Sequence, residues 1–176
     1  ESDAAMAISA IAEGKLDLKG HHFVLIGAGS AMGPFYKLLE HGATVVCIDI
    51  PGMWGERPQG MWKRLLDAAR ASPGEILVPL CRPQSECASE QDLLAALGCN
   101  LTEQPAQILN FLTAVAPGKA LTVGNYTYLD SDLHVKLSLA ADSIMRALGE
   151  RRPDPNIAFL CTPTDIHVVT DEAHKA

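Results

Sequence analysis

Short apolar runs alternate with helical patterns along this chain, and the alternation constrains the fold more than any other feature of the sequence. Each run is rich in Val, Ile and Leu and is apolar at successive positions, which is typical of a strand covered on both faces. The sequence therefore predicts an α/β domain with a doubly wound parallel sheet of about five strands, in the order 3-2-1-4-5. The expected strands are residues 22–27, 44–49, 75–80, 120–125 and 157–162.

The segments between these runs carry apolar side chains at helical spacing. Gly42 follows the first of them and is a natural stop for a helix. Residues 51–59 and 81–90 have the composition of loops, and the second of these has room for a short helix. The expected helices are residues 34–41, 61–71, 104–116 and 132–148.

Composition and charge limit the partners and the setting of the chain. Residues 1–176 are expected to form a single domain, and a start at Glu1 rather than Met indicates a processed chain or a piece of a longer one. The net charge of −7 argues against nucleic acid as a partner, and no apolar run reaches the ~20 residues of a transmembrane segment. Five cysteines without a CxxC spacing predict no metal site, and reduced thiols favour an intracellular setting, cytoplasmic or in an organelle lumen.

Three glycines lie between the first expected strand and the helix that follows it. Gly27 permits a sharp exit from the strand, Gly29 lets backbone amides approach phosphate oxygens, and Gly33 lets the helix pack closely on the sheet. Asp49, 22 residues after Gly27, ends the second strand and is placed to bind the ribose hydroxyls of adenosine. The pattern predicts a dinucleotide site that prefers NAD to NADP, a preference that Arg57 in the following loop would soften.

The 35 residues from Leu16 to Ile50 resemble the start of short-chain dehydrogenases/reductases. The turn of that family reads TGxxxGxG, and its first and last glycines match Gly27 and Gly33, whereas Ile26 and Ala31 replace its threonine and its middle glycine. The resemblance implies a Rossmann-like, NAD(P)-binding oxidoreductase. The residues expected to bind NAD, or NADP, are Gly27, Gly29, Ser30, Met32, Gly33, Asp49 and Asn125.

The catalytic motif of the family is absent. Its chemistry rests on Tyr-x-x-x-Lys, in which a lysine one helical turn away lowers the pKa of the tyrosine, and no such pair occurs in this chain. Since strand carboxyl ends converge on the ligand in this architecture, Tyr126, Tyr128 and Lys136 are the candidates for catalysis in a non-standard site. Further polar residues that follow the fourth and fifth strands are Thr127, Thr162, Thr164, Asp165 and His167.

Three functions therefore stay open. The first is an NAD(P)-dependent oxidoreductase with a non-standard active site. The second is a catalytically silent relative that acts as an accessory or structural subunit, with protein partners or as a homo-oligomer; the missing motif and the short chain favour it. The third is an S-adenosylmethionine-dependent methyltransferase, which also uses a glycine turn and an acid after the second strand. Against the third, Leu25 and Ile26 stand where those enzymes usually carry an acid.

Overall fold

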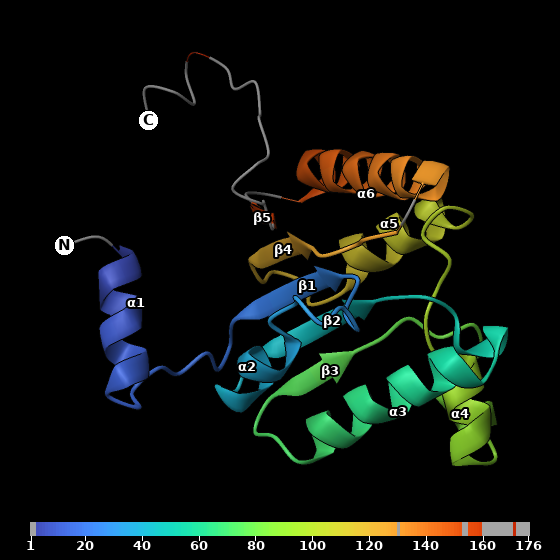
Figure 1. Ribbon diagram of the computed structural model, residues 1–176, viewed down its shortest axis with the longest axis horizontal. Helices are drawn as coiled ribbons and strands as arrows, with labels where there is room; N and C mark the ends of the chain where they lie inside the picture. The colour runs from blue at the N-terminus through green and yellow to red at the C-terminus, as the bar shows by residue number, and fades with distance from the viewer. Residues whose placement is uncertain (1–2, 130, 153–154, 160–170, 172–176) are drawn as a thin grey trace.

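The computed structural model describes residues 3–129, 131–152, 155–159 and 171. Within them five parallel strands form one sheet in the order β3-β2-β1-β4-β5 (Figure 1). This confirms the predicted α/β class, the parallel sheet and the strand order, and is consistent with a Rossmann-like fold. The strands are β1 His22–Ile26, β2 Thr44–Ile48, β3 Glu75–Leu77, β4 Leu121–Asn125 and β5 Asn156–Phe159.

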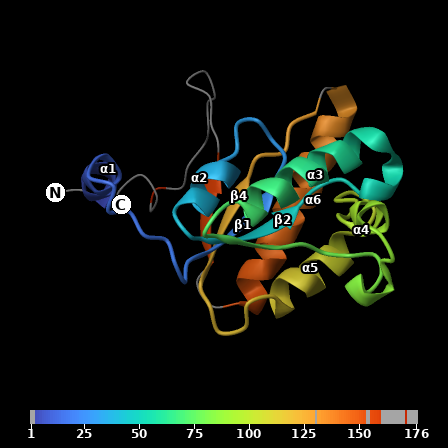
Figure 2. The ribbon, with the colours of Figure 1, turned by 90° about the horizontal axis from the view of Figure 1, so that it is seen from below.

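Helices cover both faces of this sheet. Figure 1 shows α5 and α6 on one side and α2 and α3 on the other, and Figure 2 shows the same layers from below. Two short 3₁₀ helices, η1 (Gly52–Trp54) and η2 (Gln84–Glu86), lie in the connections. The α-helices are α1 Asp3–Ala12, α2 Phe35–Glu40, α3 Glu56–Arg70, α4 Glu90–Ala96, α5 Pro105–Ala114 and α6 Ser131–Arg151.

Successive residues of β1 point to opposite faces of the sheet, and both faces are buried. Val24 and Ile26 belong to an apolar cluster with side chains of α5 and α6. Leu25 belongs to a second cluster, with side chains of α2, α3 and α4. Because both faces of the central strands are covered, apolar residues occupy consecutive positions, which is the pattern that predicted the strands.

The two halves of α6 differ in burial. In the first half Leu133, Val135 and Leu139 are mostly exposed. Leu137 and Ala140 of the first half are partly buried against the core, and the second half packs against the sheet and α5. The residues buried there are Ala141, Ile144, Met145 and Leu148.

Arg152 follows α6 directly and is buried. A helix end leaves its last carbonyl groups without helical partners, and the Arg152 guanidinium donates hydrogen bonds to carbonyl groups at the end of α5 and in the loop that follows it. The shortest run to Val115 O at 2.6 Å and Lys119 O at 2.7 Å. These bonds join the ends of α5 and α6. The remaining acceptors are the carbonyl oxygens of Leu112, Thr113 and Ala116.

Helix α3 begins earlier than predicted, so the expectation of a loop over 51–59 is wrong for its second half. The helix starts at Glu56, and Pro58 lies in its first turn, where a missing N–H removes no helical hydrogen bond. Trp62 is completely buried, and its Nε1 donates to Ile50 O at 2.9 Å. The early start of α3 therefore brings its first turns against the segment that follows β2.

The connection after β3 contains more helix than predicted. Strand β3 ends at Leu77 rather than near residue 80, because Pro79 has no N–H for a ladder, and Leu80 instead forms an antiparallel bridge with Leu97. Within the predicted loop 81–90 lies η2, and α4 starts at its end, where the Ser89 hydroxyl oxygen accepts from Asp92 N. The prediction of a short helix in this segment is confirmed.

Helix α1 had no counterpart among the predicted elements. It lies apart from the sheet in both views (Figures 1 and 2), and Met6, Ile8 and Ile11 are exposed on it. In the described part of the chain, neither this helix nor any other combines the length and apolar character required to cross a membrane.

Candidate functional site

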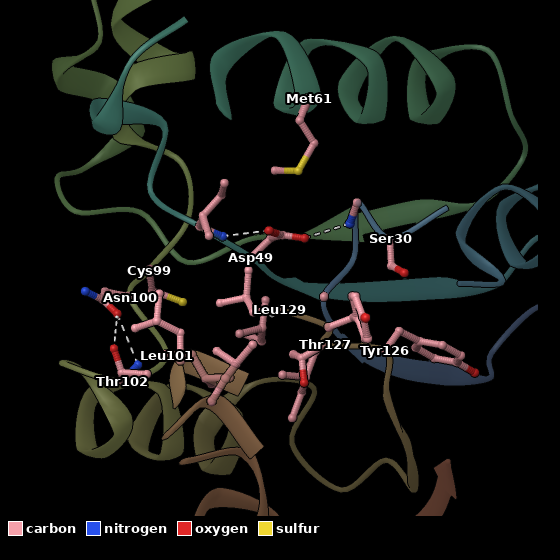
Figure 3. Close-up of a pocket in the computed structure, with 18 of the residues that line it drawn as sticks. Ser30, Asp49, Met61, Cys99, Asn100, Leu101, Thr102, Tyr126, Thr127 and Leu129 are labelled. Carbon is pink, nitrogen blue, oxygen red and sulfur yellow. Dashed lines mark hydrogen bonds between the residues drawn. The ribbon is translucent and has the colours of Figure 1, made fainter. Parts of the chain in front are cut away.

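A cavity of about 550 Å³ opens at the carboxyl edge of the sheet, where β1, β2 and β4 end (Figure 3). Its walls are formed by residues from four parts of the chain: 26–30, 48–61, 99–102, and 126–129 together with Leu133 and Leu137. In the sheet, the strand order reverses between the neighbouring strands β1 and β4. Ligands of open α/β sheets bind in the crevice beside such a switch point. The volume falls within the range of small-molecule sites, roughly 300–1,000 Å³.

Gly27 turns the chain sharply at the end of β1, as predicted. Its φ is +88°, a conformation that residues with a Cβ rarely adopt, and its N–H donates to Ile48 O at 2.8 Å. A Cβ at this position would lie 2.9 Å from the carbonyl carbon of Tyr126. Glycine is therefore needed here both for the turn and for close approach of the segment that follows β4.

Gly29 lies between Asp49 and Met61. Its N–H donates to Asp49 Oδ2 at 2.7 Å, so the carboxylate holds the amide that was expected to face a phosphate. A Cβ on Gly29 would collide with Met61 Sδ, which extends from α3 toward the turn (Figure 3). At Gly33 a Cβ would lie 3.3 Å from Ser30 O, so this glycine serves the tightness of the turn.

Asp49 fixes the glycine turn and also lines the cavity. Its Oδ1 accepts from Ile50 N at 2.7 Å, and its Oδ2 accepts from Gly29 N. Burial raises the pKa of Asp49, and the two backbone hydrogen bonds oppose that shift. Each carboxylate oxygen keeps acceptor capacity beyond its one backbone bond, so Asp49 is still able to bind a hydroxyl group in the cavity.

Two similar turns contribute to the walls of the cavity. Asn125 Oδ1 accepts from Thr127 N at 3.2 Å and Thr127 Oγ1 at 2.8 Å. Asn100 Oδ1 accepts from Thr102 N at 3.1 Å and Thr102 Oγ1 at 2.9 Å. Each threonine hydroxyl gives its hydrogen to an asparagine, so toward a ligand both oxygens act as hydrogen-bond acceptors.

The predicted cofactor residues divide into two groups. Gly27, Gly29, Ser30 and Asp49 line the cavity. The other three do not line it. Met32 is 69% exposed, Gly33 tightens the turn, and Asn125 shapes the wall through Thr127 rather than facing the cavity itself.

The catalytic candidates do not come together as a tyrosine–lysine pair at the cavity. Tyr126 and Tyr128 line it, whereas Lys136 does not, and Lys136 Nζ lies 3.5 Å from Asp132 Oδ2. The Tyr126 ring is directed away from Asp49 (Figure 3), and burial raises the pKa of its hydroxyl. The ring of Tyr128 contacts that of His134, with centroids 5.7 Å apart. The residues predicted to follow the fifth strand, Thr162, Thr164, Asp165 and His167, lie outside the described residues.

Charged side chains are few around the cavity. In the described part of the chain only Asp49 and Arg57 bring a charge to its lining. Burial, reinforced by the nearby Asp49 carboxylate, raises the pKa of the Cys99 thiol to about 12, so this side chain is a neutral part of the wall. A search of the described residues finds no group of three or more His, Cys, Asp or Glu that would hold a metal ion.

Sequence reasoning missed the wall formed by residues 99–102. That segment reaches the cavity because Cys99 N donates to Asp49 O at 2.9 Å, and because Gly98, with φ +89°, packs against Ile50 O. The turn residues Gly98 and Asn100 were the available signal. Comparison of the chain with family models, with curated proteins and with solved structures found no match.

Proposed function

We propose that this protein binds NAD, or NADP, in the cavity at the carboxyl edge of the sheet, and that it is an oxidoreductase with a non-standard active site. The observation that carries the proposal is the hydrogen bond between Gly29 and Asp49. It joins the glycine turn after β1 to the carboxylate after β2 inside one cavity, and these are two of the features of a dinucleotide site.

Under this proposal, three parts of the dinucleotide have neighbours in the cavity lining. Asp49 would bind the adenosine ribose, and the turn from Gly27 to Ser30 would lie beside the pyrophosphate. The Asp49 carboxylate repels the 2′-phosphate of NADP, which favours NAD. Arg57 reduces this preference for NAD without reversing it. Thr127, beyond the end of β4, would face the nicotinamide. Bound there, the cofactor would supply hydride acceptance or donation.

A second function, binding without catalysis, has its own support in the position of Lys136. That lysine forms an ion pair with Asp132 and does not line the cavity, so the charge that usually activates a tyrosine is elsewhere. Such a protein would keep the nucleotide site and act as an accessory or structural subunit with protein partners or as a homo-oligomer.

The test is a thermal-shift titration with NAD⁺, NADP⁺ and S-adenosylmethionine in parallel. A ligand present at one hundred times its dissociation constant stabilises the folded state by about 2.7 kcal/mol, which is readily measured. We expect a shift with NAD⁺ and a smaller one with NADP⁺. A shift with S-adenosylmethionine alone would replace the proposal with a methyltransferase, and no shift with any of the three would contradict nucleotide binding.

Two alanine variants localise the site. Gly29→Ala is expected to lose the NAD⁺ shift, because its Cβ collides with Met61 and fills the space beside the turn. Gly60→Ala is the matched control, since the nearest neighbour of its Cβ is Arg64 Nη1 at 3.9 Å. Equal NAD⁺ affinity in both variants would show that the nucleotide does not bind beside the glycine turn.

A further inference from the structure

A second cavity, of about 450 Å³, lies beside β3, the strand at one end of the sheet. Strand β3 stops at Leu77, and the residues that follow it, 78–81, form one wall. Side chains of α5 form another wall, and Pro51 and Met53 from the connection after β2 complete the lining. The volume lies within the range of small-molecule sites, roughly 300–1,000 Å³.

Apolar side chains dominate this lining, and several of them are only partly covered. Met53 is 67% exposed, and Val78, Leu80 and Phe111 are each half-buried. A ligand that fills the second cavity would remove more of their apolar surface from water, which favours binding. Single exposed apolar side chains are ordinary on a protein surface, but here four of them share one concave site.

The second cavity carries no charge. Among the residues that the structure describes, no Asp, Glu, Lys, Arg or His lines it, whereas Asp49 and Arg57 line the first cavity. A charged ligand group would lose its hydration in the second cavity without gaining an opposite charge. The lining therefore favours an uncharged occupant.

Gln104, which directly precedes α5, brings a polar group of fixed orientation to the second cavity. Its Oε1 accepts from Asn100 N at 2.8 Å, and its own N–H donates to Asn100 O at 2.8 Å. A backbone N–H only donates, so the amide oxygen of Gln104 must face Asn100, and Nε2 is the end left for a ligand. Since Nε2 donates and does not accept, the ligand must carry an acceptor such as a carbonyl oxygen.

We propose that the second cavity binds an uncharged amide with an aromatic ring, whose carbonyl oxygen accepts from Gln104 Nε2. A ring suits the lining because the Met53 thioether and the Phe111 ring both make favourable contacts with aromatic groups. This binding is independent of the nucleotide, since Gly29 and Asp49 do not line the second cavity.

The experiment titrates the protein with N,N-dimethylbenzamide, which has a carbonyl acceptor and no N–H, followed by ¹H–¹⁵N NMR. Isopropylbenzene, without the acceptor, and N,N-dimethylbenzylammonium, with a positive charge, are compounds of similar shape. The amide should bind about fivefold more tightly than isopropylbenzene, which corresponds to about 1 kcal/mol for one neutral hydrogen bond. It should also bind more tightly than the cation, although the net charge of −7 attracts cations. Any other order would overturn the inference.

Backbone amide signals locate the bound amide. The largest shifts are expected at Leu80 and Gly98, which line only the second cavity, and the smallest at Gly29 and Thr127, which line only the first. The reverse pattern would place the amide in the first cavity and would overturn the inference.

Two methionine variants provide a matched pair. Met53 is 67% exposed and lines the second cavity, whereas Met32 is 69% exposed and lines neither cavity. Met53→Ser should weaken the amide about tenfold through lost apolar contact, and Met32→Ser should leave its affinity unchanged. Equal affinities in the two variants would contradict the assignment. A wild-type dimer that Met53→Ser converts to a monomer in sedimentation would show that a second copy fills the cavity, and would overturn the amide site.

Gln104→Glu tests the donor itself. Glutamate keeps an oxygen for Asn100 N and replaces Nε2 with a second acceptor, so the local structure is retained while the donor is lost. The amide should weaken at least to the affinity of isopropylbenzene, about fivefold, whereas N,N-dimethylbenzylammonium should gain affinity from the new negative charge. Wild-type affinity for the amide in Gln104→Glu would overturn the inference.

Discussion

Polar side chains at the two edges of the sheet differ in what their hydrogen bonds leave available. At the amino edge, where β4 and β5 begin, the Arg152 guanidinium donates hydrogen bonds to carbonyl groups at the end of α5 and in the loop that follows it. At the carboxyl edge, Asp49 and Thr127 form hydrogen bonds within the chain and still present acceptor oxygens to a cavity. The comparison indicates that substitutions near the amino edge should change stability, whereas those near the carboxyl edge should mainly change binding.

The largest expected effect is at Leu148, which is fully buried near the end of α6. Leu148→Ala removes apolar contacts and leaves a cavity, so the free energy of unfolding should fall by about 2–5 kcal/mol in urea titrations. NAD⁺ affinity, measured where the variant is folded, should be unchanged. A tenfold loss of that affinity would contradict the expectation that substitutions near the amino edge change stability and not binding.

Arg152→Ala is the next largest. Several carbonyl groups at the end of α5 lose their donor, which should lower the free energy of unfolding by about 2 kcal/mol. Arg152→Lys should fall between this variant and the wild type, because a single ammonium reaches fewer of the carbonyls. Urea titration of all three proteins measures this order, and a stability of Arg152→Ala equal to that of the wild type would contradict the role of the guanidinium.

At the carboxyl edge, Asp49→Ala should weaken NAD⁺ binding about tenfold, which corresponds to about 1.4 kcal/mol. NADP⁺ binding should weaken less, because the lost carboxylate also repels a 2′-phosphate. Calorimetric titration with both nucleotides provides the comparison. Unchanged affinity for both would remove the ribose role of Asp49.

The smallest effect concerns the pH dependence of stability. Burial raises the pKa of Asp49 in the folded state above its unfolded value, so the folded state holds this proton more tightly. The stability linked to Asp49 is present below the unfolded pKa, near 3.9, and is lost as pH rises through the folded pKa. In urea titrations, Asp49→Asn should therefore gain stability relative to the wild type as pH rises above about 4. A stability difference between Asp49→Asn and the wild type that falls as pH rises would contradict a raised pKa of Asp49.

The strands were predictable because both faces of the sheet are buried, so β1 is apolar from Phe23 to Ile26 and β2 is apolar from Val45 to Ile48. Helix α3 was predicted too short since Pro58 was read as a loop residue, although it fits the first turn of a helix. Helix α1 was not predicted; all of its residues except Asp3 and Ser9 are apolar, and Met6, Ile8 and Ile11 are exposed.

The site was predictable where a local motif or the end of a strand marks it, as at Tyr126 and Tyr128 after β4. The spacing of Gly27, Gly29 and Asp49 predicted three residues that line the cavity. The wall containing Thr102 was not predictable, since it depends on the long-range bond from Cys99 N to Asp49 O. Side-chain direction at Tyr126 is set by tertiary packing, which local pattern does not encode.

The position of β1 in the sheet also has a consequence for the order of events in folding. His22 pairs with Thr44, a short distance along the chain, and also with Leu121, which is 99 positions later. Pairings between distant residues form slowly, because a long loop must close first. A growing chain is therefore able to assemble β1, β2 and β3 early. The cavity, whose last wall is supplied by residues 126–129 together with Leu133 and Leu137, forms only when β4 docks against β1.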